Sequence, residues 1–236
     1  LTLFSPGATN SLGANKNYVI DGVRPTVSSI LRCNSSGSTS SETNPTNGSS
    51  IWFKVTWNEN VVNIDAADFT VHNPNSISGS PAITAVSASS GSSVVVTVST
   101  GSGDGILGLY GNDNNSSDIA DSAGNELQAA YTGGETYTID KTAPTVTSVT
   151  GTTGNGTFRI GQTIQLAVHF SENITVSGTP QLTLETGTTD AVVDQSGQGS
   201  NILYFEYTVA SPHESGDLRY QSTTALSGSG IKDAAN

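Results

Sequence analysis

Tyr137-Thr-Ile-Asp140-Lys-Thr-Ala-Pro144-Thr-Val146 is the stretch around which this chain is organised, and Tyr18-Val-Ile-Asp21-Gly-Val-Arg-Pro25-Thr-Val27 has the same pattern 119 residues earlier. In each stretch a β-branched strand ends at an Asp, a Pro blocks further sheet pairing, and a new β-branched run begins. We therefore interpret residues 21–25 as a first seam and residues 140–144 as a second seam between consecutive β domains.

The composition favours a chain that collects cations. Acidic residues outnumber basic residues 20 to 8, which gives a net charge of −12. This charge argues against nucleic acid as a partner, because the phosphates would repel it. Cys33 is the single cysteine, so no intrachain disulfide can form. A bacterial surface protein fits this better than a eukaryotic ectodomain, and no apolar run approaches the length of a membrane span.

The first repeat is predicted at residues 22–140, close to the size of a β-sandwich domain of about 100 residues. Apolar residues alternate with others from Ile51 to Trp57, and this period of two marks a half-buried strand that ends at Asn58-Glu59-Asn60. A turn over residues 65–71 is expected to lead to a short strand. The other strands are expected at residues 26–31, 83–86, 94–98, 106–110 and 131–139.

The second repeat is predicted at residues 141–236 and follows the same order. Ser171-Glu172-Asn173 lies where Asn58-Glu59-Asn60 lies in the first repeat, and Asp233 lies where Asp121 lies. Strands are expected at residues 145–149, 164–170, 181–185, 192–193, 202–209 and 218–220. No stretch shows a sustained helical period with caps. The sequence therefore predicts an all-β fold of tandem Ig-like antiparallel β-sandwiches, with the last strand missing from the second.

Residues 1–21 belong to neither repeat. Tyr18-Val-Ile-Asp21 copies the strand that precedes the second seam, so we expect residues 1–21 to hold the closing strand or strands of a preceding repeat. The alternative is donor-strand addition, in which residues 1–21 of one copy complete the second repeat of another copy and build a filament. Without a donor, apolar surface would be exposed around Ile164, Val168 and Phe170.

Several short motifs recur in the places where a known family has them. They are Ile139-Asp140-Lys-Thr-Ala-Pro144, Phe170-Ser-Glu172, Asp65-Ala-Ala-Asp68-Phe69-Thr, Thr100-Gly-Ser-Gly-Asp104-Gly, Asp121-Ser-Ala-Gly-Asn125 and Gly133-Gly-Glu135-Thr-Tyr137. With these motifs the chain resembles, over nearly its whole length, the tandem bacterial Ig-like repeats of large cell-surface proteins and adhesins. The resemblance implies an extracellular location on a bacterial surface and a role as a stalk or an adhesive module. The second repeat departs from the pattern, because it lacks a Gly before Asn236 and differs at residues 186–199.

Acidic residues are predicted to gather at the seams. If the strands of a repeat run alternately down and up, the end of the second strand and the loop before the last strand lie beside the preceding seam. The candidate metal ligands at the first seam are Asp21, Glu59, Asp118, Asp121 and Asn125. Those at the second seam are Asp140, Glu172, Asp233 and Asn236, with Asp104 reaching across from the lower end of the first repeat.

Carboxylates that cluster in this way repel one another, and Ca²⁺ relieves the repulsion by accepting six to eight oxygen ligands in flexible geometry. Mg²⁺ demands stricter octahedral geometry. The competing interpretation is turn chemistry, since Asp and Asn side chains bond the nearby backbone. Glu59 and Glu172 are the sharpest candidates, because Glu is a poor turn residue. Calcium is the one cofactor we predict.

The predicted function is that of a non-enzymatic, extracellular structural segment of a repetitive surface, adhesin or filament protein, stiffened by Ca²⁺ at its seams. Its partners would be neighbouring Ig-like repeats or copies of the same chain. The alternative is an Ig-like module that binds a glycan or a cell-surface protein. Such a module could also be an accessory domain of a secreted enzyme. Trp52, on the opposite phase of its strand from Trp57, and the loop of residues 34–49 would then carry the binding. No serine or histidine pattern indicates catalysis.

Overall fold

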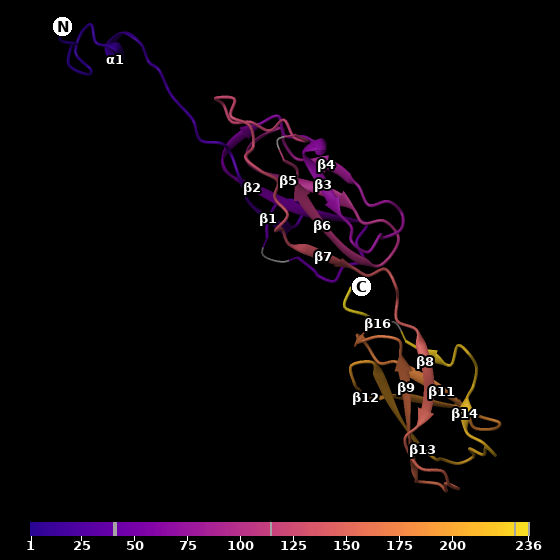
Figure 1. Cartoon of the computed structure of the whole chain (residues 1–236). Helices are drawn as coiled ribbons and strands as arrows, with labels where there is room; N and C mark the ends of the chain where they lie inside the picture. Colours follow the sequence, from indigo (N-terminus) through magenta and orange to yellow (C-terminus); the bar gives the residue numbers. More distant parts are fainter. Residues whose placement is uncertain (40–41, 114, 229, 236) are drawn as a thin grey trace.

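The computed structural model describes residues 1–39, 42–113, 115–228 and 230–235. Its strands form two antiparallel β-sandwiches that follow one another end to end, with an extended arm of residues 1–24 projecting from the far end of the first (Figure 1). The all-β, Ig-like sandwich prediction is confirmed. No helix among the described residues has the length and apolar character that a membrane span needs.

The described residues of the first sandwich, unit 1, form seven strands and one turn of 3-10 helix. The elements are β1 (Val27–Cys33), β2 (Ser50–Val62), η1 (Ala66–Asp68), β3 (Phe69–His72), β4 (Ile83–Val86), β5 (Ser90–Ser99), β6 (Gly105–Gly111) and β7 (Thr136–Ile139). One sheet has the order β1-β2-β5-β4 and the other has the order β3-β6-β7. This arrangement of four and three strands is the topology of a constant-type immunoglobulin domain.

The core of unit 1 follows from the alternating sequence of β2. Phe53 and Val55 are buried, and the ring of Phe53 meets that of Tyr137 edge-on at 5.4 Å between centroids, which joins the two sheets. Residues 44–46 return along β7. The backbone N–H of Thr46 donates to the carbonyl of Thr138 at 3.0 Å, and Thr46 pairs in parallel with Ile139. The edge of β7 is thereby covered, as edge strands usually are.

The second sandwich, unit 2, has longer strands on one side than on the other. Its strands are β8 (Val146–Gly151), β9 (Thr163–Phe170), β10 (Thr175–Val176), β11 (Gln181–Glu185), β12 (Ala191–Gln198), β13 (Ile202–Thr208), β14 (Arg219–Tyr220), β15 (Leu226–Ser227) and β16 (Ile231–Lys232). Strands β8, β9, β13 and β12 repeat the order of β1, β2, β5 and β4, and β14 and β15 both pair with β11. The start of β12 pairs with β11 and its end pairs with β13, so β12 connects the two sheets.

Three expectations are wrong in detail. β2 continues through Asn58-Glu59-Asn60 to Val62, because a register shift between Thr56 and Val61 lets it resume pairing with β5. Strand β7 begins only at Thr136, and Tyr131 makes an isolated bridge instead.

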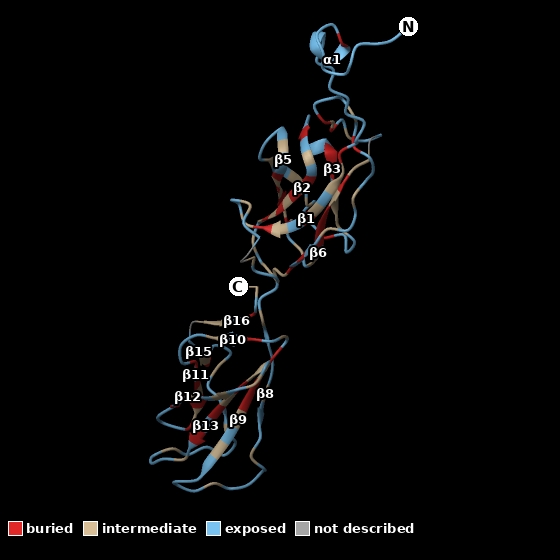
Figure 2. Cartoon of the chain, turned by 90° about the vertical axis from the view of Figure 1, so that its left-hand side faces the viewer, coloured by how far each residue is buried: buried red, intermediate tan, exposed pale blue. Residues whose placement is uncertain are grey.

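The third concerns exposure. Val168 and Phe170 are buried, because β9 lies in the interior of its sheet, whereas Ile164 is partly buried. Residues 18–21 pair with no strand among the described residues, Leu12–Asn15 forms a single helical turn, α1, and the interpretation of residues 1–21 stays a prediction. Figure 2 shows this arm almost entirely in the colour of exposed residues.

The two hydrophobic cores share no residue, so we expect the two units to unfold in separate transitions. Phe53→Ala and Phe205→Ala each remove a fully buried ring and are expected to destabilise their own unit by about 3–5 kcal/mol. Both tryptophans lie in β2, so tryptophan fluorescence reports on unit 1 alone. The fluorescence midpoint in urea should fall in Phe53→Ala and stay unchanged in Phe205→Ala. An equal fall in both variants would contradict independent cores.

Candidate functional site

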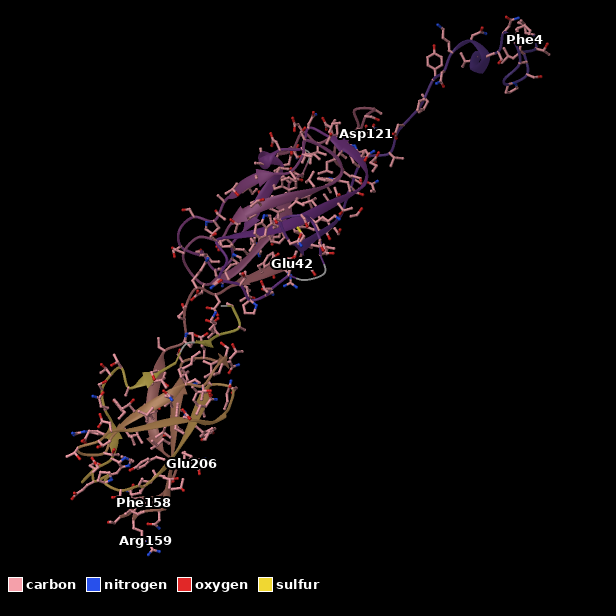
Figure 3. All side chains as sticks on the ribbon, turned by 180° about the vertical axis from the view of Figure 1, so that it is seen from behind. Phe4, Glu42, Asp121, Phe158, Arg159 and Glu206 are labelled. Carbon is pink, nitrogen blue, oxygen red and sulfur yellow. The ribbon has the colours of Figure 1, made fainter. Side chains whose placement is uncertain are left out.

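Two groups of three carboxylates stand at equivalent places in the two units. Asp21, Glu59 and Asp121 form the first-seam cluster, and their oxygens lie within 4.8 Å of one another. Asp140, Glu172 and Asp233 form the second-seam cluster within the same limit. Figure 3 labels Asp121 at the end of unit 1 where the arm enters. Each cluster combines one acid from a seam, a Glu within or just after the second strand of its unit, and one acid from a later loop.

The position of each Glu is set by a backbone clamp at the residue before it. At the first seam the N–H of Thr26 donates to Asn58 Oδ1 at 2.7 Å, and the N–H of Asn58 donates to the carbonyl of Thr26 at 3.1 Å. At the second seam Thr145 and Ser171 exchange the same pair of bonds, at 3.0 and 2.9 Å. The start of each unit is thereby tied to the residue that precedes its Glu.

The loop acids are buried and held by backbone donors. Asp121 is 3% exposed, and its Oδ1 accepts from the N–H groups of Ala123 and Asn125 at 2.8 and 2.9 Å. Its Oδ2 accepts from Asn125 Nδ2 at 2.7 Å. The Asn125 bond, followed by these backbone bonds, holds the pKa of Asp121 below its usual range although burial opposes the shift. Asp233, also 3% exposed, accepts from the N–H of Ala235 at 2.7 Å.

The seam acids are fixed by their own turns and by unit 1. Asp21 Oδ1 accepts from the N–H of Val23 at 3.1 Å, and Asp140 Oδ1 accepts from the N–H of Thr142 at 3.2 Å. The backbone of each is also anchored. Asn125 Nδ2 donates to the carbonyl of Asp21 at 3.2 Å, and the N–H of Asp140 donates to the carbonyl of Thr46 at 3.0 Å.

Turn chemistry accounts for the four Asp residues of the clusters but not for the two Glu residues. Each Asp accepts a bond from a backbone N–H two residues on, which is the usual Asx turn. Glu59 has only a 3.4 Å contact from Asn58 Nδ2. Glu172 has no hydrogen bond or salt bridge in the described part of the chain. Nothing local therefore explains why a Glu stands at both places.

The second-seam cluster is electrostatically unfavourable without a counter-charge. Burial raises the pKa of Glu172 above its usual range, and the nearby charges of Asp140, Asp233 and Asp104 raise it further. Two unit charges at such distances repel by about 1 kcal/mol in water and about 4 kcal/mol near a protein surface. Oxygens that share one Ca²⁺ at about 2.3–2.6 Å lie at most about 5 Å apart. The oxygens of each cluster, all within 4.8 Å of one another, are close enough to contact one such ion.

The remaining predicted ligands lie beside the clusters. Asp104 reaches the second seam, where it accepts from the N–H of Lys141 and the hydroxyl of Thr142, and these bonds hold its pKa below the usual range. Asp118 is exposed and is not among the three carboxylates of the first-seam cluster. Asn125 supports Asp121 through its amide nitrogen. Asn236 lies outside the described residues.

Sequence reasoning missed Lys141, which ties the second seam to unit 1. Its Nζ donates to the carbonyls of Asn47 and Gly48 at 2.6 and 2.8 Å. The N–H of Asn47 donates to the carbonyl of Ala235 in unit 2 at 3.3 Å. A comparison of the two seams could have identified Lys141. The first seam has Gly22 at the same position, so the positive charge is specific to the second seam.

Trp52 stays a predicted ligand-binding residue. It is partly buried, pairs with Cys33 and Thr97 on the neighbouring strands, and accepts a bond from Tyr137 Oη on its carbonyl at 3.3 Å. A surface cavity of about 270 Å³ lies elsewhere on unit 1. It is lined by Thr70, Tyr110, Gly111, Asn112, Asp113, Ser116, Ala130 and Thr132. Trp52 is not part of this lining.

No protein-family model matches the sequence, and no curated protein matches it at a significant level. Among solved structures the chain is similar to FdeC, an adhesin of Escherichia coli, with 13% sequence identity and a TM-score of 0.34. The similarity covers 78% of this chain and 54% of that one, so the chain spans about half the length of that structure. A similarity this distant says nothing about function, and the resemblance to tandem bacterial Ig-like repeats stays a prediction.

Glu172→Gln is expected to stabilise unit 2 in a chelator at pH 7. The raised pKa means that the stability contributed by Glu172 is present below the pKa of an unfolded Glu, about 4.3, and is lost as the pH rises through the folded value. The calorimetric Tm of unit 2 in EDTA should therefore exceed that of the wild type at pH 7, and the difference should vanish near pH 4.

Glu206→Gln is the matched control, because Glu206 is exposed on β13 away from the seam (Figure 3). It removes the same charge from the same unit and should leave the Tm unchanged at both pH values. Equal stabilisation by both variants would mean that net charge, and not the cluster, is responsible.

Proposed function

We propose that this chain is a non-enzymatic, extracellular structural segment of a repetitive surface or adhesin-type protein, in which Ca²⁺ bound at each seam stiffens the joint between successive sandwiches. The proposal is supported by the order of the parts. The two sandwiches lie in line (Figure 1), and each is preceded by a short seam that begins with an Asp. The net charge of −12 also attracts cations to the chain.

The observation that carries the proposal is the recurrence of the carboxylate cluster. Asp140 is bonded through its backbone to unit 1, whereas Glu172 and Asp233 belong to unit 2. A cation shared by the three would therefore connect the two sandwiches. The first-seam cluster connects the arm to unit 1 in the same manner. Six acids at matched positions, two of them Glu without a turn role, favour a common ligand over six independent turns.

Ca²⁺ suits these clusters better than Mg²⁺. Each cluster offers carboxylates of different length from three separate segments, and Ca²⁺ tolerates such irregular geometry, whereas Mg²⁺ requires a near-ideal octahedron. Three carboxylates leave several coordination positions for backbone carbonyls and water. Sites of this kind on extracellular modules bind with Kd of about 0.1–1 mM. We place the chain outside the cell because such weak sites need millimolar calcium.

The mechanical effect follows from where the charges stand. Without a cation the three acids of the second seam repel one another, and the repulsion favours bending that moves Asp140 away from Glu172 and Asp233. Bound Ca²⁺ would attract all three carboxylates, so that it holds Asp140 beside Glu172 and Asp233. Lys141, bonded to the carbonyls of Asn47 and Gly48, fixes the seam on the side of unit 1. Calcium would thus convert a jointed chain into a rod.

The test is thermal unfolding in EDTA and in about 10 mM Ca²⁺, some ten to a hundred times the Kd expected. Binding to the folded form alone should stabilise by about 1.4–2.7 kcal/mol, which is roughly 5–15 °C for a domain of this size. The shift in unit 2 should disappear in Glu172→Gln and Asp140→Asn and persist in Glu206→Gln. Small-angle scattering should show a narrower distribution of interunit angles in calcium.

If the wild-type Tm does not change in calcium, the clusters bind no ion. The acids would then be ordinary turn residues, and the chain would be a spacer that calcium does not stiffen. Stabilisation by Ca²⁺ that survives in Glu172→Gln would place the ion away from the second-seam cluster. Mg²⁺ at the same concentration is the control for ionic strength, and it is expected to give a much smaller shift.

A further inference from the structure

The surface cavity of about 270 Å³ on unit 1, the Tyr110 cavity, lies on the outer face of the sheet β3-β6-β7. Thr70 of β3 and Tyr110 of β6 are partners across the two strands, and both are more exposed than their buried neighbours Phe69 and Leu109. Their side chains therefore point away from the core, because successive side chains of a strand alternate between its two faces. The loop after β6 and residues 130–132 complete the lining.

The ring of Tyr110 is held in place by His72. The two rings stack at 4.5 Å between centroids, with 26° between their planes. His72 is not part of the cavity lining. Since His72 covers one face of the Tyr110 ring, the other face is the one that a ligand can contact. A tyrosine side chain has only two rotatable angles, so it offers a large contact area at a small cost in conformational entropy.

The polar wall of the cavity is fixed by the bonds that Asn112 makes to the rest of unit 1. Its backbone N–H donates to the carbonyl of Asp68 at 2.8 Å, and its Nδ2 donates to the carbonyl of Ala67 at 2.7 Å. Its Oδ1 accepts from the hydroxyl of Thr70 at 2.7 Å. The loop after β6 is thereby tied to η1 and β3, so the cavity is formed before any ligand arrives, as small-molecule sites usually are.

Other polar groups of the lining have no partner in the described part of the chain. Asp113 Oδ1 accepts from the N–H of Asn115 at 3.2 Å, whereas its Oδ2 accepts no hydrogen bond there. The hydroxyls of Tyr110, Ser116 and Thr132 likewise make none. The cavity thus offers one carboxylate oxygen, which only accepts, and three hydroxyls, which both donate and accept.

We propose that the Tyr110 cavity binds one residue of a neutral saccharide. The apolar C–H face of the sugar ring packs on the ring of Tyr110, and its hydroxyls bond Asp113 and the hydroxyls of the lining. A hydrogen bond from a sugar hydroxyl to a carboxylate is about twice as strong as one between neutral groups. The volume lies just below the range of about 300–1,000 Å³ that holds drug-sized ligands, which suits a single sugar ring.

The chemistry of the lining disfavours other ligands. Asp113 is the one charged residue among the described residues of the lining, and with the net charge of −12 it repels a phosphate, a sulfate or an acidic sugar. An ammonium or guanidinium group only donates hydrogen bonds, whereas each sugar hydroxyl donates and accepts and so matches both kinds of group on the wall. The site belongs to unit 1 alone and does not rest on the proposed calcium sites.

Amide NMR spectra of the isotope-labelled full chain in EDTA test the proposal. The probes are the methyl glycosides of glucose, galactose, mannose and N-acetylglucosamine. Each is added up to about 50 mM, because an open site for one sugar ring is expected to bind with a Kd of about 1–10 mM. At least one probe should shift the amide signals of the lining residues in a saturable manner and leave those of unit 2 unchanged.

Substitutions of the lining test the named contacts. Tyr110→Ala should weaken binding about tenfold through loss of the stacking ring, whereas Tyr110→Phe keeps the ring and should weaken it by about threefold or less. Asp113→Asn keeps an oxygen that accepts from Asn115 but removes the charge, so binding should weaken about threefold to tenfold. Asp190→Asn, exposed just before β12 in unit 2, is the matched control and should bind as the wild type does.

Tryptophan fluorescence in urea identifies the variants in which unit 1 is folded, and only these are compared. The proposal is overturned if none of the four glycosides shifts the lining signals, or if Tyr110→Ala binds as tightly as the wild type. Equal affinity of Asp113→Asn and Asp190→Asn would also overturn it. Shifts of the lining signals by N-acetyl-arginine amide, with none from the glycosides, would assign the cavity to a cationic side chain instead.

Discussion

The missing N–H of one proline at each seam is the constraint on which the rest of the architecture depends. Pro25 and Pro144 cannot donate to a neighbouring strand, so sheet pairing does not run through either seam. The chain then has only a few residues in which to leave one sandwich and enter the next. Because the connection is so short, the Asp at its start stays beside the end of the next unit's second strand. Sheet termination and the gathering of carboxylates therefore have the same cause.

The acids at the seams stabilise the fold through hydrogen bonds, and their like charges also repel one another. Asp121 and Asp233 close the loops in which they lie, and their bonds to backbone N–H groups would be made with or without an ion. The energetic conflict is concentrated on Glu172, whose charge is disfavoured by burial and by three neighbouring carboxylates. A Glu stands at the same place in unit 1, and the proposed calcium ion would relieve the conflict at Glu172.

Much of the fold could be predicted from the sequence because its strands alternate cleanly. β11 falls at residues 181–185 as expected, and the clusters contain Glu59 and Glu172 as expected. The wrong or missing predictions concern contacts between residues far apart in the sequence. Nothing local distinguishes Asp118 from Asp121, three residues apart in one acidic loop, and the direction of the turn decides which faces the seam. The polar residues 44–46 carry no strand signal, and they pair with β7 because its edge is available. The bonds of Lys141 depend on carbonyls almost a hundred positions away.

The parallel pairing of residues 44–46 with β7 has a consequence for a chain under tension. Force entering unit 1 along β1 leaves it along β7, and β7 is held at its edge by three bonds. Asn44 Oδ1 accepts from the N–H of Thr138, the N–H of Thr46 donates to the carbonyl of Thr138, and the N–H of Asp140 donates to the carbonyl of Thr46. These bonds lie across the line of pull and share the load in shear, so they have to break together instead of opening one after another. The strand that transmits tension to the second seam is thus held on both of its edges, by β6 and by residues 44–46.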